Sequence, residues 1–248
     1  MGLFLLGYRR NKISLAELDW FPAIWFGGSL FGLSILLAGY LRAGYSHVHQ
    51  SISELGTTGT PYSWLVRWVG FMSLGSSFVL FAHQTRDLFS SYAPSVIFLL
   101  TGLAVLISGI FPSDPNNRRD TLSGKGHALA VITLLFLLNL APFTFSISTL
   151  YRTPPAEWFS VFSLLMGILT LGFLGILPNF DSPLILALHR RILGRLIVNW
   201  YPLHGLHQRL LLAMHFLWWL VFSRILTLLP ENLLTLTTHL HIECGTAW

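Results

Sequence analysis

Six apolar segments, each close to the length needed to cross a lipid bilayer, constrain the fold of this chain more than any other feature. A helix needs about 20 predominantly apolar residues to span the hydrocarbon core. The segments occupy residues 20–41, 64–82, 94–111, 128–147, 158–177 and 206–228. Charged residues make up 10% of the 248 residues, against about 25% in soluble proteins. We therefore expect an all-α polytopic membrane bundle of six transmembrane helices.

The six segments follow one another without a linker that would separate domains. We expect one six-helix transmembrane domain over residues 1–230 and a C-terminal tail over residues 231–248. Between the fifth and sixth spans, Arg190, Arg191 and Arg195 interrupt an otherwise apolar stretch. Because this pattern is typical of a helix lying along the membrane surface, we predict a short basic amphipathic helix there.

Six crossings place both termini on the same side of the membrane. Arg9, Arg10 and Lys12 precede the first span and outweigh Arg42, which follows it. Positively charged flanks favour the cytoplasm, so we expect a multi-pass protein of the cell membrane with cytoplasmic termini. The count of Lys and Arg over all loops favours the opposite orientation, unless the three arginines of the predicted amphipathic helix are left out.

A polar loop follows the first span, on the side opposite the termini. Ser51 and Glu54 have the spacing of a capping box, which gives both residues a structural explanation. His47, His49 and Ser53 have no such explanation. Two histidines at alternate positions of an extended loop could direct both rings to one ligand, but a solvated loop explains them equally well.

Two further polar clusters lie at the end of the third span and the start of the fourth. Asp114 precedes a proline and is explained as a turn former, or alternatively as an acid, a base or an orienter of a histidine. His127 enters the fourth span, where a polar side chain needs a partner. A neighbouring carbonyl could serve, but Asp114 is only a loop away and is the partner that we expect.

The fourth cluster lies at the start of the last span. His204, His207, Gln208 and His215 project from one face of a helix within about 100° of arc, and this face should point into the bundle. The spacing of His204 and His207 is compatible with metal binding, zinc included, but two histidines are weakly specific without a third ligand. Arg209 points elsewhere and could hold a lipid phosphate.

The order of these motifs resembles that of a known family. Ser-Ile-Ser-Glu-Leu-Gly at 51–56, the motif at 109–114, His127 and Gly-Leu-His-Gln-Arg at 205–209 are similar in content and order to the uncharacterised six-span family named domain of unknown function 998. The resemblance covers roughly residues 20–229. Residues 52–57 are also similar to the loop after the first helix in the DRAM and Frag group of eukaryotic membrane proteins. That group includes factors implicated in remodelling lipid anchors, which implies lipid substrates by analogy.

One function that these residues favour is a membrane-embedded hydrolase or transferase acting on a lipid or lipid-linked substrate. Asp114 and His127 would then transfer protons, and Ser53 with Glu54 would supply a nucleophile or a polarising contact. The residues expected to bind substrate are His47, His49, His204, His207, Gln208 and Arg209. The face with His204, His207 and Gln208 could bind a metal instead.

The alternative function is non-catalytic, and the two hypotheses stay open at the level of sequence. The protein would bind lipids or stabilise a partner, and the same polar residues would form a hydrogen-bond network that joins helix ends. Membrane lipids are the expected partners in both cases. Nucleic acid is not expected, because the net charge of +5 is spread over loops on both sides of the membrane.

Overall fold

Helices account for nearly all of the structure. The computed structural model describes residues 20–85, 92–115, 119–147, 154–176 and 203–228, and none of these residues lies in a β-strand, which confirms the all-α fold. A single turn, α2 (Ile52–Leu55), follows the first helix, and a π-helical stretch, η2 (Leu65–Phe71), leads directly into α3. The long helices are α1 (Trp20–Leu41), α3 (Met72–Thr85), α4 (Ala93–Ile110), α5 (Leu122–Ile147), α6 (Pro154–Ile176) and α9 (His204–Leu228).

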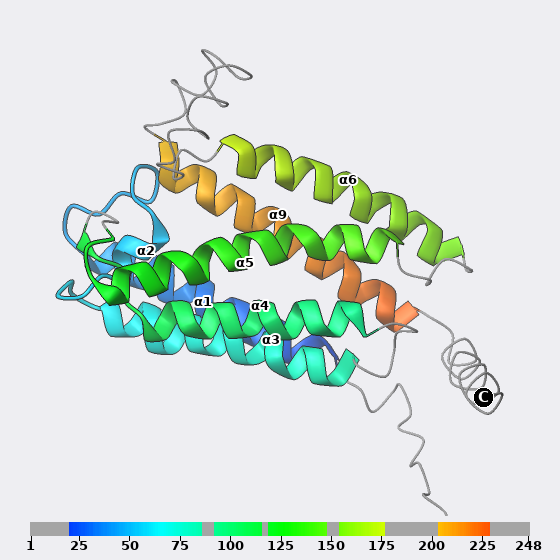
Figure 1. Cartoon of the computed structure of the whole chain (residues 1–248), viewed down its shortest axis with the longest axis horizontal. Coiled ribbons are helices and arrows are strands. Elements are labelled where there is room, and N and C mark those ends of the chain that lie inside the picture. Colours follow the sequence, from blue (N-terminus) through cyan, green and yellow to red (C-terminus); the bar gives the residue numbers. More distant parts are fainter. Residues whose placement is uncertain (1–19, 86–91, 116–118, 148–153, 177–202, 229–248) are drawn as a thin grey trace, which may run out of the picture.

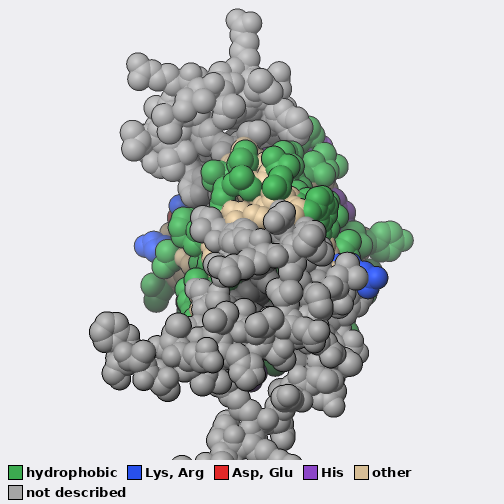
Figure 2. Space-filling view, turned by 90° about the vertical axis from the view of Figure 1, so that its right-hand side faces the viewer, with side chains coloured by type: hydrophobic (Ala, Val, Ile, Leu, Met, Phe, Trp, Pro, Cys, Tyr) green, Lys and Arg blue, Asp and Glu red, His purple; other side chains and the backbone are tan. Residues whose placement is uncertain are grey.

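The described helices have the length and composition of membrane spans. Four stretches, in α1, in η2 with α3, in α4 and in α5, are apolar over 18 to 25 residues, and only 39–56% of each is buried inside the bundle. Figure 2 views the end opposite α2 and shows that hydrophobic side chains form most of the described surface visible there. Apolar side chains facing outward at this density are stable in lipid, so this is a membrane protein.

The long helices run up and down and form a ring (Figure 1). Each helix packs against the next along the chain, from α1 through α3, α4, α5 and α6 to α9, and α9 returns to touch α1. The ends of α1 and α4 and the starts of η2, α5 and α9 therefore meet at the α2 end of the bundle (Figure 1). The predicted amphipathic helix and the C-terminal tail lie outside the described residues.

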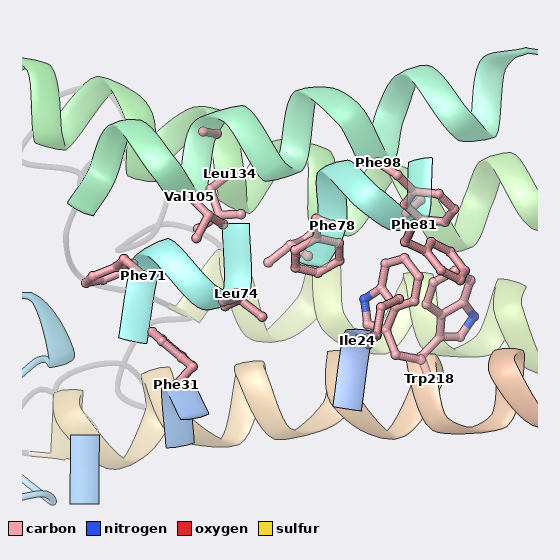
Figure 3. Close-up of a cluster of buried hydrophobic side chains, with 14 of the residues drawn as sticks. Ile24, Phe31, Phe71, Leu74, Phe78, Phe81, Phe98, Val105, Leu134 and Trp218 are labelled. Atoms are coloured by element: carbon pink, nitrogen blue, oxygen red, sulfur yellow. The ribbon is translucent and has the colours of Figure 1, made fainter. Parts of the chain in front are cut away.

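A cluster of aromatic rings fills the half of the bundle away from α2. Phe98 lies 4.5 Å from Trp219 between ring centroids, and Phe145 lies 4.5 Å from Phe222. Figure 3 shows Phe81, Phe98 and Trp218 gathered on one side of the core. Aromatic pairs of this kind contribute about 0.5–1.5 kcal/mol each beyond their buried area. We call this set the aromatic cluster; it comprises Phe78, Phe81, Phe98, Phe145, Phe159, Trp218, Trp219 and Phe222.

Helix α5 begins earlier than the apolar pattern predicts. The pattern started the fourth span at residue 128, whereas the helix begins at Leu122. Thr121 caps it, because its Oγ1 accepts a hydrogen bond from the Gly124 N–H at 3.0 Å. His127 therefore lies inside the helix, one turn deeper than its first residues.

Candidate functional site

All four predicted polar clusters lie at the α2 end of the bundle (Figure 1). We call the described residues that gather there, 42–57, 109–115, 119–127 and 204–209, the polar rim. The Leu206 N–H donates to the Val48 carbonyl at 2.9 Å, and the Ser113 hydroxyl donates to the Ser53 carbonyl at 2.7 Å. The first loop therefore contacts both the start of α9 and the loop after α4.

Arg209 ties α9 to the loop that follows α1. Its Nη1 donates to the carbonyls of Gln50 at 3.0 Å and Gly205 at 2.8 Å, and its Nη2 donates to the Tyr45 hydroxyl at 2.6 Å. Tyr45 in turn donates to the Ser51 carbonyl at 2.8 Å, and burial raises the pKa of Tyr45 above its usual value. A lipid phosphate at Arg209 would have to share a guanidinium that already makes three bonds within the protein.

Glu54 has a structural task. It forms the predicted capping box, with its Oε1 accepting from the Ser51 N–H at 3.0 Å. Its Oε2 accepts from the Gln50 side-chain amide at 3.0 Å. Next to this turn, the Ile52 N–H donates to Gln208 Oε1 at 2.8 Å. Both carboxylate oxygens of Glu54 therefore stabilise α2 and the loop before it.

The expected pair of Asp114 with His127 does not form. Asp114 is 7% exposed and accepts from Thr121 twice, from the N–H at 2.9 Å and from the hydroxyl at 2.6 Å. These bonds hold the pKa of Asp114 below its usual value. The Nδ1 of His127 instead bonds the carbonyls of Ser108 at 3.0 Å and Phe111 at 2.8 Å, which is the neighbouring-carbonyl alternative. Asp114 bonds Thr121 and not His127, and these bonds orient the residue that caps α5.

Two glycines allow the elements of the polar rim to approach closely. A Cβ at Gly124 would overlap the carboxylate of Asp114, and a Cβ at Gly205 would overlap the carbonyl of Gln50. Both sites therefore need a residue without a side chain.

The two histidines of the first loop have different surroundings. His47 is partly buried, and its ring meets the edge of the Tyr45 ring at 5.2 Å between centroids. Burial lowers the pKa of His47, and the nearby charge of Arg209 lowers it further. His49 is exposed. The structure therefore does not direct the two rings to one buried point.

The histidines at the start of α9 do not gather with further metal ligands. His207 is 2% exposed and stacks on Phe173 of α6, with 5.3 Å between ring centroids. His204 is partly exposed at the first position of the helix. Within the described part of the chain, no three His, Cys, Asp or Glu side chains are placed to hold a metal ion.

An apolar cavity lies between the polar rim and the aromatic cluster. The space between its lining atoms amounts to about 680 Å³, a volume that includes open solvent. On α9 its lining runs from Gln208 to Trp219, which is about 16 Å along the helix axis. Its sixteen lining residues are Phe31, Ile52, Ser53, Phe71, Leu74, Phe78, Val105, Val131, Leu134, Leu135, Leu138, Gln208, Leu212, His215, Phe216 and Trp219.

Three of the lining residues are polar. Ser53 and Gln208 lie at the rim end of the cavity, and His215 lies deeper on α9. The stripe that the sequence predicts on α9 thus points inward, since Gln208 and His215 line the cavity and His207 is buried against α6.

The sequence pattern of a known family matches residues 26–225. The chain belongs to the DUF998 family, a group of proteins of unknown function. No curated protein and no solved structure matches the chain. The DUF998 match extends from α1 to α9 and includes the polar rim and the cavity. The family indicated by the motifs is confirmed, whereas the similarity to the DRAM and Frag group stays a prediction.

Two kinds of residue at this end of the bundle were not predicted from the sequence. Thr121, which links Asp114 to α5, has the residue type preferred for a helix N-cap and precedes an apolar run, so this signal could have identified it. The apolar cavity residues on α3 and α5, such as Leu74 and Leu134, carry no comparable signal. An apolar residue that lines a cavity looks the same in sequence as one that packs against a neighbour.

Proposed function

We propose that this protein binds a lipid or a lipid-like molecule inside its helix bundle, and that the polar rim holds the helix ends together above the binding site. The cavity carries this proposal. Thirteen of its sixteen lining residues are apolar, and ligand pockets are typically lined by hydrophobic and aromatic side chains with a few polar groups. A lipid chain is the ligand that matches such a lining in a membrane protein.

The bonding of the polar rim supports a non-catalytic role. Glu54, Asp114 and Arg209 each make two or more hydrogen bonds within the protein. A general acid or base must have an atom within reach of its substrate, whereas these groups are occupied by helix caps and loop contacts. Hydrogen bonds that join loops to helix ends in this way are typical of a structural role.

A lipid hydrolase or transferase is the second candidate function, and the position of Ser53 favours it. Ser53 lines the cavity at its rim end, next in sequence to Glu54. A serine nucleophile needs a base within hydrogen-bond reach. The oxygens of Glu54 accept from Ser51 and Gln50 instead, so this candidate is the less well supported of the two.

We further propose that α6 and α9 cross the membrane as well, which gives six spans with both termini in the cytoplasm. Outward-facing residues on both helices are apolar, with Leu165 at 60% and Leu217 at 49% exposure. Both helices also take part in the aromatic cluster beside α4 and α5. The single cysteine, Cys244, provides a test. In sealed cells a membrane-impermeant maleimide should label it only after permeabilisation, and labelling of intact cells would contradict this orientation.

The cavity can be tested by filling it. Leu212→Trp places a large ring in the cavity, and Leu217→Trp places the same ring on the outer face of the same helix. We expect full-length protein purified in detergent to retain a lipid, identified by mass spectrometry, and to bind radiolabelled stearate. Both signals should fall at least tenfold in Leu212→Trp and stay unchanged in Leu217→Trp.

Equal lipid retention and stearate binding in both variants would contradict binding in this cavity. The same preparations distinguish the enzyme from the binding protein. If the retained lipid is converted over time by wild-type protein and not by Ser53→Ala, the hydrolase or transferase function is correct. If the lipid stays intact, the binding function stands.

A further inference from the structure

The rim end of the cavity presents two polar side chains to an otherwise apolar space. Ser53 belongs to the single turn α2, and Gln208 belongs to the start of α9. Among the other lining residues only His215 is polar, and none is an aspartate, glutamate, lysine or arginine. A molecule in this cavity therefore meets uncharged polar groups at one end and apolar side chains along most of its length.

The orientation of the Gln208 amide is fixed by the backbone of α2. Its Oε1 accepts from the Ile52 N–H at 2.8 Å, and since a backbone N–H can only donate, the other amide atom is the Nε2 donor group. This Nε2 group has no hydrogen-bond partner in the described part of the chain and keeps accessible surface. Because α9 uses the backbone of Gln208 for its own hydrogen bonds, the side chain is the part that offers a donor to the cavity.

The hydroxyl of Ser53 is the second donor. The Ser53 carbonyl accepts from the Gly56 N–H at 3.0 Å and from the Ser113 hydroxyl at 2.7 Å, so its backbone is occupied by α2 and the loop after α4. Its side-chain Oγ makes no hydrogen bond within the described residues and is not enclosed. Ile52, which anchors the Gln208 amide, directly precedes Ser53. The two donors therefore lie on adjacent elements at the same end of the cavity.

Two uncharged donors at one end of an apolar cavity match a carbonyl oxygen, which has two lone pairs and can accept from both. A phosphate would bring a charge, and a charge is costly to bury without a charged partner. Arg209 does not supply that partner, because it does not line the cavity and its bonds go to the first loop and to Gly205.

We propose that the polar group of the bound lipid is an uncharged acyl group, as in an ester, an amide or a protonated fatty acid. Its carbonyl oxygen accepts hydrogen bonds from Nε2 of Gln208 and from the hydroxyl of Ser53. The acyl chain then extends along α9 towards Trp219, between the apolar lining residues. This inference rests on the proposed function and names the polar group of its ligand.

The test compares two lipids that differ only in the carbonyl. Methyl stearate carries this group, and octadecyl methyl ether has a methylene group in its place. Each competes with radiolabelled stearate for binding to the full-length protein in detergent. Wild-type protein should bind the ester about tenfold more tightly than the ether, which is the effect expected of two uncharged hydrogen bonds.

Three variants test the two donors. Gln208→Glu keeps an oxygen for the Ile52 N–H but replaces the amide donor with an acceptor, so the preference for the ester should disappear. Ser53→Ala removes the other donor without breaking a hydrogen bond of the described structure, and should lower the preference to about threefold. Ser53→Thr keeps a hydroxyl and should restore it.

A control separates these donors from the rest of the bundle. Ser76→Ala makes the same exchange as Ser53→Ala at an exposed position on α3 and should keep the wild-type ratio. The affinity for the ether should stay unchanged in every variant, because the ether lacks the carbonyl and reports on the apolar part of the cavity.

The outcomes distinguish this inference from the proposed function. If wild-type protein binds the ester and the ether equally well, water satisfies the two donors and the inference is wrong, although lipid binding stands. If Gln208→Glu or Ser53→Ala retains the full preference, that residue does not hold the carbonyl and the inference is again wrong. If stearate, the ester and the ether all fail to bind to the wild-type protein, the proposed function itself fails.

Discussion

Replacing Arg209 with glutamine should lower the free energy of unfolding by about 2–4 kcal/mol. Arg209 donates to two carbonyls and to the Tyr45 hydroxyl, and so joins α9 to a loop about 160 residues earlier in the chain. A hydrogen bond to a charged group contributes about 1.5–3 kcal/mol. The expected loss is smaller than the sum of three such bonds, because the glutamine amide can replace one donor and water can reach the partly exposed site.

A double-mutant cycle isolates the bond between Arg209 and Tyr45. Tyr45→Phe removes both the acceptor for Arg209 and the donor to the Ser51 carbonyl, and should cost about 1–2 kcal/mol. Because the two single variants lose one bond in common, the double variant should be less destabilised than their sum. The expected coupling is about 1 kcal/mol, within the range for residues in one network.

The assay is equilibrium unfolding of the full chain in mixed micelles, followed by tryptophan fluorescence during titration with a denaturing detergent. Lys125→Gln is the control, because it removes a positive charge from an exposed side chain at the same end of the bundle, and should change stability by less than about 0.5 kcal/mol. If Arg209→Gln is as mild as Lys125→Gln, or if the cycle with Tyr45→Phe is additive, the network does not hold the polar rim together.

Two further predictions concern the same end of the bundle. Gly205→Ala should destabilise by about 2 kcal/mol or more, because its Cβ would overlap the Gln50 carbonyl, whereas Gly32→Ala, with no atom near its Cβ, should be neutral or stabilising; the same unfolding assay compares them, and equal effects would refute the close approach. Asp114 has a pKa lowered below 3.8 by its bonds from Thr121, so its contribution is present at higher pH and is lost as pH falls through the lowered pKa. The stability difference between wild type and Asp114→Asn, measured as a pH series, should therefore be constant above about pH 5 and shrink in more acidic solution; a difference that does not change with pH would contradict this.

The fold was largely predictable because apolar length and helix caps are local signals. The all-α class and the capping box of Ser51 with Glu54 follow from short stretches of sequence. The start of α5 was predicted too late because glycines and polar residues at 123–127 hide a helix that Thr121 caps. A count of apolar residues takes no account of a capping residue, so it places the polar residues that follow the cap outside the helix.

The candidate site was predictable only in part. Its place at one end of the bundle followed from the alternation of spans, and the inward face of α9 followed from helical periodicity. The partners of Asp114 and His127 did not follow, because each side chain could bond to several groups in the same loop and only the backbone path decides among them. The cavity could not be predicted either, since whether Leu134 or Leu212 meets a neighbour or an empty space depends on helix packing.

The helix ends explain why this bundle concentrates polar residues at its rim. The last carbonyls of a helix lack partners within the helix, and at the end of α4 these groups are met by Arg67, which donates to Gly109 and Ile110, and by His127, which bonds Ser108 and Phe111. A cluster of basic and polar side chains is thus required by a helix that ends near the membrane, whether or not the protein has an active site. Function must therefore be assigned from polar residues that line the cavity and have no such task.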